Sequence, residues 1–180
     1  SRRQRQMCIR DSIWIASYPK SGNTWVRSFL TAYYFCENGI FDIDKLNLIE
    51  DYPNKQFFKE KVKQGEIHKH WETSQKDIRD QKKVKFLKTH NSLITAFGND
   101  FTKPEFTLGV IYVIRDPRNV ITSVKNHNDL DSYDEALKFM QDENKVLEDY
   151  PHLKNYAKTN IVNSWRINYR SWLSNKSFRR

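Results

Sequence analysis

The chain has 180 residues and a formal net charge of +9, and 38% of its residues are hydrophobic and 29% charged. These proportions are typical of one soluble globular domain and, with 14% aromatic residues, exclude a disordered chain. No segment approaches the roughly 18 consecutive apolar residues of a membrane span, so we expect no membrane association.

Residues 1–11 show neither helical nor strand periodicity and carry four arginines. The tract resembles the conceptual translation of a sequencing adapter, so we expect a non-native tail followed by one domain over residues 12–180. A genuine basic arm for nucleic acid or anionic lipid is the alternative.

The N-terminus lacks the apolar core of a signal peptide, and two cysteines are too few for a disulfide framework. We therefore expect a cytoplasmic protein. Cys36 is expected to be a small apolar residue on a buried helix.

The first predicted elements are a strand and a helix. Residues 13–17 are a short apolar run typical of a buried strand. Residues 23–37 have apolar side chains at helical spacing, and Asn38-Gly39 supplies a stop signal. The side chains expected on the apolar face of this helix are Val26, Phe29, Leu30 and Tyr33.

The stretch 40–83 is charged and aromatic, and we expect helices near 54–64 and 72–82. Its lysines alternate with acidic residues, which favours a solvated surface over a nucleic-acid-binding stripe. Residues 84–88 then predict a second strand.

Residues 109–114 predict the clearest strand, because they are apolar on both faces, as in parallel sheets covered by helices. Asp116-Pro117 is a helix start, with the aspartate as N-cap. Further helices are expected at 132–149 and about 160–174. Strands that alternate with helices through long crossovers indicate an α/β domain with a mainly parallel sheet.

The segment Ser17–Trp25, with the sequence SYPKSGNTW, joins the first strand to the first helix. Such a junction directs unpaired backbone N–H groups and the positive end of the helix dipole at one point. Gly22 allows close approach of an anion, and Lys20, Ser21 and Thr24 add donors. An ordinary capped helix is the alternative.

Taken together, these nine residues closely resemble the 5′-phosphosulfate-binding loop of the sulfotransferase family, whose cofactor is 3′-phosphoadenosine 5′-phosphosulfate (PAPS). The resemblance implies that Lys20 stabilises charge on the leaving phosphate during catalysis. Trp25 could lie against a flat base or pack in the core. The residues that the resemblance assigns to cofactor binding here are Lys20, Ser21, Gly22, Asn23, Thr24 and Trp25.

The segment Tyr112–Ser123 looks like the family's 3′-phosphate-binding motif, with its Arg and Ser eight positions apart. Arg115 offers a planar fork suited to a phosphate, and Ser123 adds a hydroxyl donor. A local ion pair between Arg115 and Asp116, with Ser123 as a neutral helix residue, is the alternative. The nearby residues expected at the surface are Arg118, Lys125 and His127.

Lys88-Thr89-His90 closes the second strand. Side chains alternate along a strand, so Lys88 and His90 project to the same side at the carboxyl end, where open α/β sheets bind ligands. The family's catalytic base is a His in a Lys-Thr-His triplet, which points to His90, and Lys88 would help hold the transferring sulfonate. The other histidines are expected to be structural or exposed: His68, His70, His127 and His152.

The resemblance runs from about residue 13 to 173, where Trp165 and Trp172 look like the family's aromatic positions. It implies a P-loop NTPase-like, three-layer α/β fold. Family members continue with another strand and a Gly-rich loop, so we expect this chain to be a fragment of about the N-terminal two-thirds, truncated at the C-terminus.

The resemblance implies a PAPS-dependent sulfotransferase of the cytosolic, small-molecule type. It would move a sulfuryl group to a hydroxyl or amine of a small acceptor, release adenosine 3′,5′-bisphosphate (PAP) and need no metal. The acceptor and the oligomeric state are left open by the sequence.

Two other functions are compatible with parts of the sequence. A P-loop nucleotide or sugar kinase would share the fold, but the five glycines form neither a Walker A loop nor G-x-G-x-x-G. A non-enzymatic basic module could bind nucleic acid, but no known reader motif is present. We therefore expect no nucleic-acid partner.

Overall fold

The computed structural model describes residues 12–63, 65–81, 83–148 and 158–178. Predictions for the tail at 1–11 and for His152 lie outside this part of the chain. Among the described helices, none is long and apolar enough to cross a membrane.

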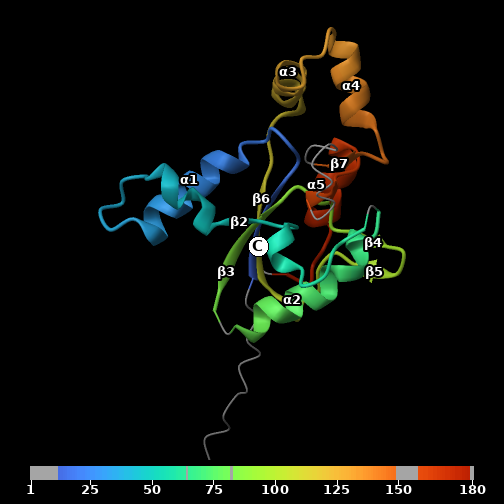
Figure 1. Cartoon of the computed structure of the whole chain (residues 1–180). Helices are drawn as coiled ribbons and strands as arrows, with labels where there is room; N and C mark the ends of the chain where they lie inside the picture. The colour runs from blue at the N-terminus through green and yellow to red at the C-terminus, as the bar shows by residue number, and fades with distance from the viewer. Residues whose placement is uncertain (1–11, 64, 82, 149–157, 179–180) are drawn as a thin grey trace, which may run out of the picture.

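A four-stranded parallel sheet lies at the centre, in the order β2-β3-β1-β6 (Figure 1). Its strands are β1 (Ser12–Ser17), β2 (Glu50–Asp51), β3 (Lys85–Thr89) and β6 (Thr107–Val113). The three strands predicted from apolar runs are therefore confirmed, and so is the α/β fold with a mainly parallel sheet flanked by helices.

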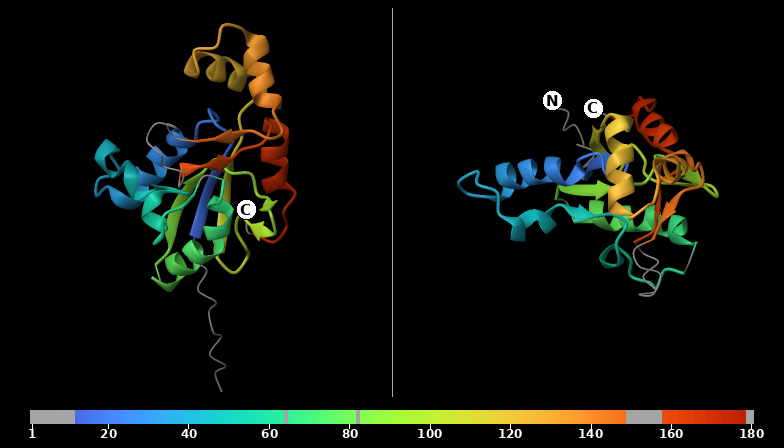
Figure 2. Two further views of the ribbon diagram at one scale, coloured as in Figure 1. Left: turned by 45° about the vertical axis from the view of Figure 1, so that its right-hand side comes forward. Right: turned by 90° about the horizontal axis from the view of Figure 1, so that it is seen from above.

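Helices surround this sheet, with α3 and α4 beyond the carboxyl ends of β1 and β6 and α2 near the opposite end (Figures 1 and 2). The helices are α1 (Asn23–Phe35), α2 (Trp71–Asp80), α3 (Pro117–His127), α4 (Tyr133–Gln141) and α5 (Trp165–Leu173). Short 3₁₀ turns cover Ile43–Leu48, Lys55–Phe57 and Ile67–His70. Two small antiparallel pairs complete the fold: β4 (Thr95–Ala96) with β5 (Asn99–Asp100), and β7 (Val146–Leu147) with β8 (Asn160–Ile161).

The helix predicted near 54–64 is wrong, because only the 3₁₀ turn Lys55–Phe57 forms there. Phe57 and Val62 are both buried in the same core cluster. A helix would direct two side chains five positions apart toward different sides, so an irregular path buries both.

The last two predicted helices are shorter than expected. α4 begins where the Ser132 hydroxyl caps the Glu135 N–H, and it ends at Gln141 because Asp142 is extended. The chain from Val146 then pairs as β7 with β8, so α5 starts only at Trp165.

The predicted inner face of α1 is wrong. Phe29 and Tyr33 are 57% and 79% exposed, whereas Asn23, Arg27 and Thr31 form the buried face. Their spacing of four residues places these three polar side chains on one side of the helix. The most buried face of the helix is therefore polar, while Val26 and Leu30 of the predicted apolar face are half-buried.

Two other expectations about burial also fail. Cys36 is half-buried just beyond the end of α1 instead of on a buried helix. β6 is an outer strand of the described sheet, and its Ile111 is 37% exposed although the run is apolar on both faces.

The main core is aromatic and holds the sheet from one side. Trp14 of β1 contacts the rings of Tyr52 and Phe101, each at a centroid distance of 5.2 Å. The buried Trp14 Nε1–H also donates to Thr107 Oγ1 of β6 over 3.1 Å. A second cluster packs α3 and α4 against the loop that follows β1 through Tyr18, Val120, Val124, Ala136, Met140 and Val162. This packing fixes the strand ends at which the site forms.

Candidate functional site

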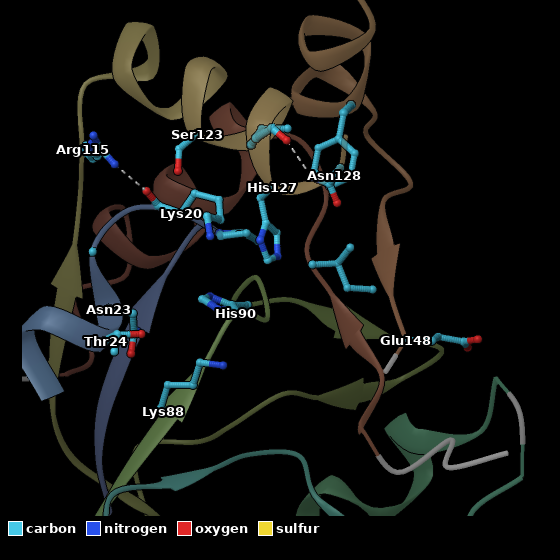
Figure 3. A pocket seen from close by; sticks show the side chains of 15 residues that line it. Lys20, Asn23, Thr24, Lys88, His90, Arg115, Ser123, His127, Asn128 and Glu148 are labelled. Atoms are coloured by element: carbon cyan, nitrogen blue, oxygen red, sulfur yellow. Dashed lines mark hydrogen bonds between the residues drawn. The ribbon is translucent and has the colours of Figure 1, made fainter. Parts of the chain in front are cut away.

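A pocket of about 540 Å³ opens at the carboxyl ends of β1, β3 and β6 (Figure 3). Loops that follow parallel strands meet at this edge of a sheet, which is where open α/β folds bind ligands. The pocket brings together eight residues predicted from the sequence: Lys20, Gly22, Asn23, Thr24, Lys88, His90, Arg115 and Ser123.

The loop after β1 is shaped to present backbone donors. Lys20 and Gly22 have positive φ angles of 64° and 96°. Gly22 is the N-cap of α1, and no side chain of the described residues caps this helix. The first backbone N–H groups of α1 therefore point to the pocket with the positive end of the helix dipole behind them.

Two buried oxygens in this loop have no hydrogen-bond partner among the described residues, Ser21 Oγ and Asn23 Oδ1. Buried polar atoms are usually paired, and of these two only the Ser21 hydroxyl can donate to an anion, because the Asn23 oxygen is an amide carbonyl that only accepts. The Asn23 amide nitrogen is already used, because it donates to Ile15 O and Ser17 Oγ over 3.0 and 3.1 Å.

Two residues assigned to the cofactor loop do not line the pocket, Ser21 and Trp25. Ser21 is buried behind the loop. Trp25 is 69% exposed on α1 and packs edge-to-face against Phe29 at 4.4 Å between centroids. The indole therefore does not pack in the core.

Arg115 follows β6 and reaches across to the first loop. Its Nη1 donates to the Lys20 carbonyl over 3.2 Å. The local ion pair considered for Arg115 does not form; Asp116 instead pairs with Arg118 and caps α3 through the Arg118 N–H. Ser123 lines the same pocket from α3.

The partly buried His90 is oriented by the first strand. Its Nδ1 lies 2.8 Å from the Ser17 carbonyl oxygen. A carbonyl only accepts, so Nδ1 carries the hydrogen and the neutral ring has its lone pair on Nε2. The site therefore holds the tautomer that a general base needs.

The surroundings of His90 keep its ring neutral. The pKa of His90 is lowered from its ordinary 6.5 to about 3, mainly by burial and to a smaller extent by the nearby charges of Lys88, Arg27 and Lys20. The hydrogen bond to the Ser17 carbonyl acts in the opposite direction.

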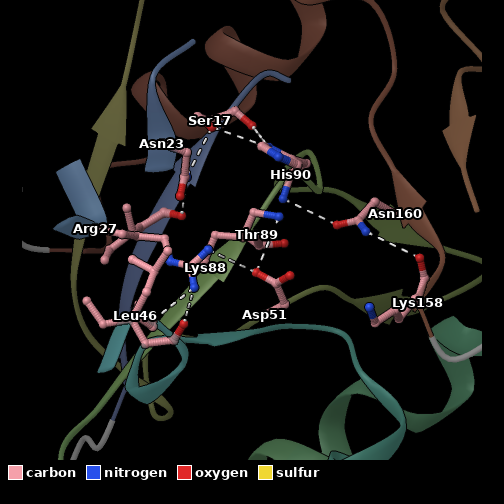
Figure 4. A network of polar contacts seen from close by, with 12 residues as sticks. Ser17, Asn23, Arg27, Leu46, Asp51, Lys88, Thr89, His90, Lys158 and Asn160 are labelled. Carbon is pink, nitrogen blue, oxygen red and sulfur yellow. Dashed lines mark hydrogen bonds and ion pairs between the residues drawn. The ribbon is translucent and has the colours of Figure 1, made fainter. Parts of the chain in front are cut away.

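Asp51 of β2 links two cations beneath the pocket (Figure 4). Its Oδ1 lies 3.4 Å from Lys88 Nζ and 3.5 Å from Arg27 Nη1. Arg27 is buried on α1, and its Nη2 donates to the carbonyls of Leu46 and Ile49 over 3.1 and 2.7 Å. Nothing in the sequence distinguishes Asp51 from the other acidic residues between 40 and 83.

A second pocket of about 680 Å³ adjoins the first and shares Phe139, Leu147 and Glu148 with it. Its remaining wall is mostly apolar and includes Ile67, His68, Phe97, Val146 and Ile161. No sequence motif predicts this pocket, because its walls come from four separate segments. His68 is buried against Phe97, with 4.9 Å between ring centroids, as expected of a structural histidine.

The site is rich in cations and poor in metal ligands. Among the described residues that line the first pocket, Glu148 is the one acidic residue, against Lys20, Lys88 and Arg115. Within the described ranges, no three His, Cys, Asp or Glu side chains gather as a metal site would require. The pocket is thus suited to an anionic ligand.

A comparison with known protein families shows to which family the chain belongs. The chain matches the family described as "Sulfotransferase domain" over residues 10–179, nearly its whole length. The chain belongs to the sulfotransferase family. A search of curated proteins found no match for this sulfotransferase. Family membership makes sulfuryl transfer its general chemistry.

The depressed pKa of His90 predicts that acid destabilises this sulfotransferase. In the unfolded chain the imidazole of His90 takes up a proton below about pH 6.5. In the folded protein the same ring stays neutral until the pH falls to about 3. Stability contributed by His90 is therefore present above pH 6.5 and is lost as the pH falls toward 3. Urea unfolding at several pH values between 7 and 4 measures how the free energy of unfolding depends on pH. The slope of this free energy against pH should be smaller in His90→Gln, because unfolding then takes up fewer protons, by up to about one. An unchanged slope would contradict the burial of a neutral ring.

Proposed function

We propose that this sulfotransferase moves a sulfuryl group from PAPS to a hydroxyl or amine of a small-molecule acceptor, with His90 as the general base. The observation that carries the proposal is the meeting of Lys20, His90 and Arg115 in one pocket. They come from three strand ends far apart in the sequence, and each carries the chemistry that its motif implies.

The pocket fits a doubly phosphorylated nucleotide. Unpaired N–H groups at the start of α1 and the ammonium group of Lys20 are donors and suit one phosphate group with its sulfate. Arg115 and Ser123 lie at the same pocket and suit a second phosphate. When bound, PAPS supplies a sulfuryl group on a phosphate leaving group.

Each residue of the chain then has a defined task. Nε2 of His90 accepts the proton of the acceptor while Nδ1 stays bound to Ser17. Lys20 and the loop N–H groups stabilise charge on the leaving phosphate. Lys88 holds the transferring sulfonate, with Asp51 beside its ammonium group. Arg115 and Ser123 anchor the 3′-phosphate and so discriminate against ATP.

We assign the acceptor to the second pocket. It adjoins the first at Phe139 and Leu147, and its wall is mostly apolar. Such a surface favours an acceptor with an apolar body, since burial of apolar area drives binding there. The Lys-Thr-His triplet at 88–90 supports the cytosolic, small-molecule type of the family.

The direct test is transfer of radioactive sulfate from labelled PAPS to a panel of apolar alcohols, phenols and amines, with ATP–Mg²⁺ as a competing donor. We expect a labelled acceptor and PAP as products. Binding of ATP–Mg²⁺ in preference to PAP would instead favour a kinase. Salt-dependent binding of oligonucleotides that PAP does not displace would favour a nucleic-acid module.

Arg115→Gln tests the assignment of the 3′-phosphate. A hydrogen bond to a charged group contributes about 1.5–3 kcal/mol, so we expect about a tenfold to hundredfold loss of affinity for PAP. The affinity for 5′-AMP, which lacks the 3′-phosphate, should change little. Calorimetric titration with both nucleotides measures the difference. An equal loss for the two would mean that Arg115 acts only by holding the Lys20 carbonyl.

A further inference from the structure

Both backbone polar groups of His90 are bound by asparagine side chains, of which Figure 4 shows Asn160. The His90 N–H donates to Asn160 Oδ1 over 3.2 Å, and Asn168 Nδ2 donates to the His90 carbonyl over 3.0 Å. The ring is held separately by Ser17. The proposed base is therefore fixed at three points, two of which come from residues that none of the sequence motifs contains.

Asn168 is fully buried on α5, and both its amide nitrogen and its amide oxygen form hydrogen bonds. The two hydrogens of its Nδ2 are shared among His90 O, Val162 O and Ser92 Oγ, the last two over 2.9 and 3.2 Å, and its Oδ1 accepts from Tyr112 Oη–H over 2.7 Å. One amide thus ties the loop after β3 to β6 and to the chain after β8. A buried amide satisfied in this way defines one arrangement of its neighbours.

Asn160 lies in β8 and binds the same loop twice. Its Oδ1 accepts from Asn91 Nδ2 over 3.2 Å as well as from the His90 N–H. Asn91 is fully buried, and its Oδ1 accepts from the Ile161 N–H over 2.8 Å. The neighbours of Asn160 along the chain, Thr159 and Ile161, line the second pocket.

Neither Asn160 nor Asn168 lines the first pocket, so neither touches the proposed reacting atoms. Both are neutral amides, and they hold the backbone of His90 without placing a carboxylate next to it. A carboxylate at that position would favour the protonated imidazole and raise its pKa. The two amides therefore hold the His90 backbone in place and leave its imidazole ring neutral.

We infer that Asn160 and Asn168 are positioning residues, which hold His90 so that its Nε2 is aimed at the acceptor. This inference rests on the proposed function, in which His90 is the base. Catalysis requires the reacting atoms to be placed closely, and a displacement of about 1 Å can cost about 10²-fold in rate. Asn160 lies in β8 between Thr159 and Ile161, which line the second pocket. Its hydrogen bond to the His90 N–H therefore connects the base to the wall of the pocket in which the acceptor would bind.

The test compares Asn160→Ala, which removes the accepting oxygen, with Asn160→Asp, which keeps it. We expect Asn160→Ala to lower kcat about tenfold to hundredfold, while the affinity for PAP stays unchanged. Asn160→Asp should recover most of this loss above neutral pH and shift the acidic limb of the pH–rate profile to higher pH, because its charge raises the pKa of His90. Asn144→Ala, at an exposed asparagine outside both pockets, is the matched control.

The position of His90 can also be followed without any turnover. Nitrogen-15 NMR of histidine-labelled protein reports the tautomer of each ring, and the His90 signals are those lost in His90→Gln. We expect one Nδ1–H tautomer in the unchanged protein and averaging of the two tautomers in Asn160→Ala. Should Asn160→Ala not fold, as judged by urea unfolding, Asn160→Ser keeps a shorter acceptor and should give intermediate averaging.

The outcomes separate this inference from the proposed function. No sulfuryl transfer by the unchanged protein, together with the expected tautomer change, would overturn the function and leave the positioning role standing. An unchanged kcat or an unchanged His90 tautomer in a folded Asn160→Ala would overturn the positioning role. So would an Asn160→Asp variant as slow as Asn160→Ala at every pH.

Discussion

Replacing Lys20 by alanine should reduce the rate of sulfuryl transfer by about 10²–10³-fold, the usual cost of losing one donor to charge that develops in the transition state. Lys20 lines the pocket from the loop after β1, next to the uncapped start of α1. Its ammonium group is the side-chain cation of this loop and would face the leaving phosphate. Steady-state kinetics with labelled PAPS measure the loss, which we expect mainly in kcat.

The backbone at Lys20 requires a second variant. Its φ of 64° is in the left-handed region, where asparagine is tolerated better than alanine. Lys20→Asn therefore removes the charge with less strain and should be nearly as slow as Lys20→Ala. Lys125→Ala, on α3 outside the pocket, should keep full activity. Near-normal turnover in Lys20→Asn would remove Lys20 from the catalytic scheme.

Replacing His90 by glutamine should lower kcat by about 10²–10⁴-fold, the range expected for loss of a general base. Glutamine is of similar size and keeps a donor for the Ser17 carbonyl, so the strand end should retain its structure. The affinity for PAP should change little, because phosphate binding is assigned to the first loop and to Arg115. Kinetics and calorimetric titration on the same preparation separate the two effects.

The pH profile adds a readout specific to this residue. A histidine with an ordinary pKa would lose its basic form as the pH falls through about 6.5. The pKa of His90 in the protein without ligands is about 3, so kcat/KM should show no loss from its protonation between pH 8 and 5. A fall in kcat/KM centred near pH 6.5, absent from His90→Gln, would show that the ring is more solvated than the structure indicates.

The main features of the site could be predicted from local sequence. A strand, a short loop with Gly22 and a helix define one phosphate-binding junction, and Lys88 and His90 alternate onto one side at the end of β3. Parallel strands bring their carboxyl ends to one edge, so the pocket at β1, β3 and β6 follows from chain order. The match to the sulfotransferase family confirms the resemblance on which these predictions converged.

Predictions that relied on apolar periodicity alone were less successful. The spacing of Phe29 and Tyr33 predicted an inner face for α1, yet both side chains are exposed. The buried side is polar because Arg27 reaches the carbonyls of Leu46 and Ile49, and those acceptors come from another segment. A hydrophobic pattern cannot show where such acceptors lie.

Local sequence was enough to predict the fold class, the family and the three motifs around the first pocket, because each depends on residues adjacent in the chain. Packing between distant segments sets the neutral tautomer of His90, the position of Asp51 and the hydrogen bonds from Asn160 and Asn168. His90 is bonded to partners 70 to 78 positions away. Contacts over such separations leave no periodic signal, since they arise only when β8 and α5 pack against the end of β3.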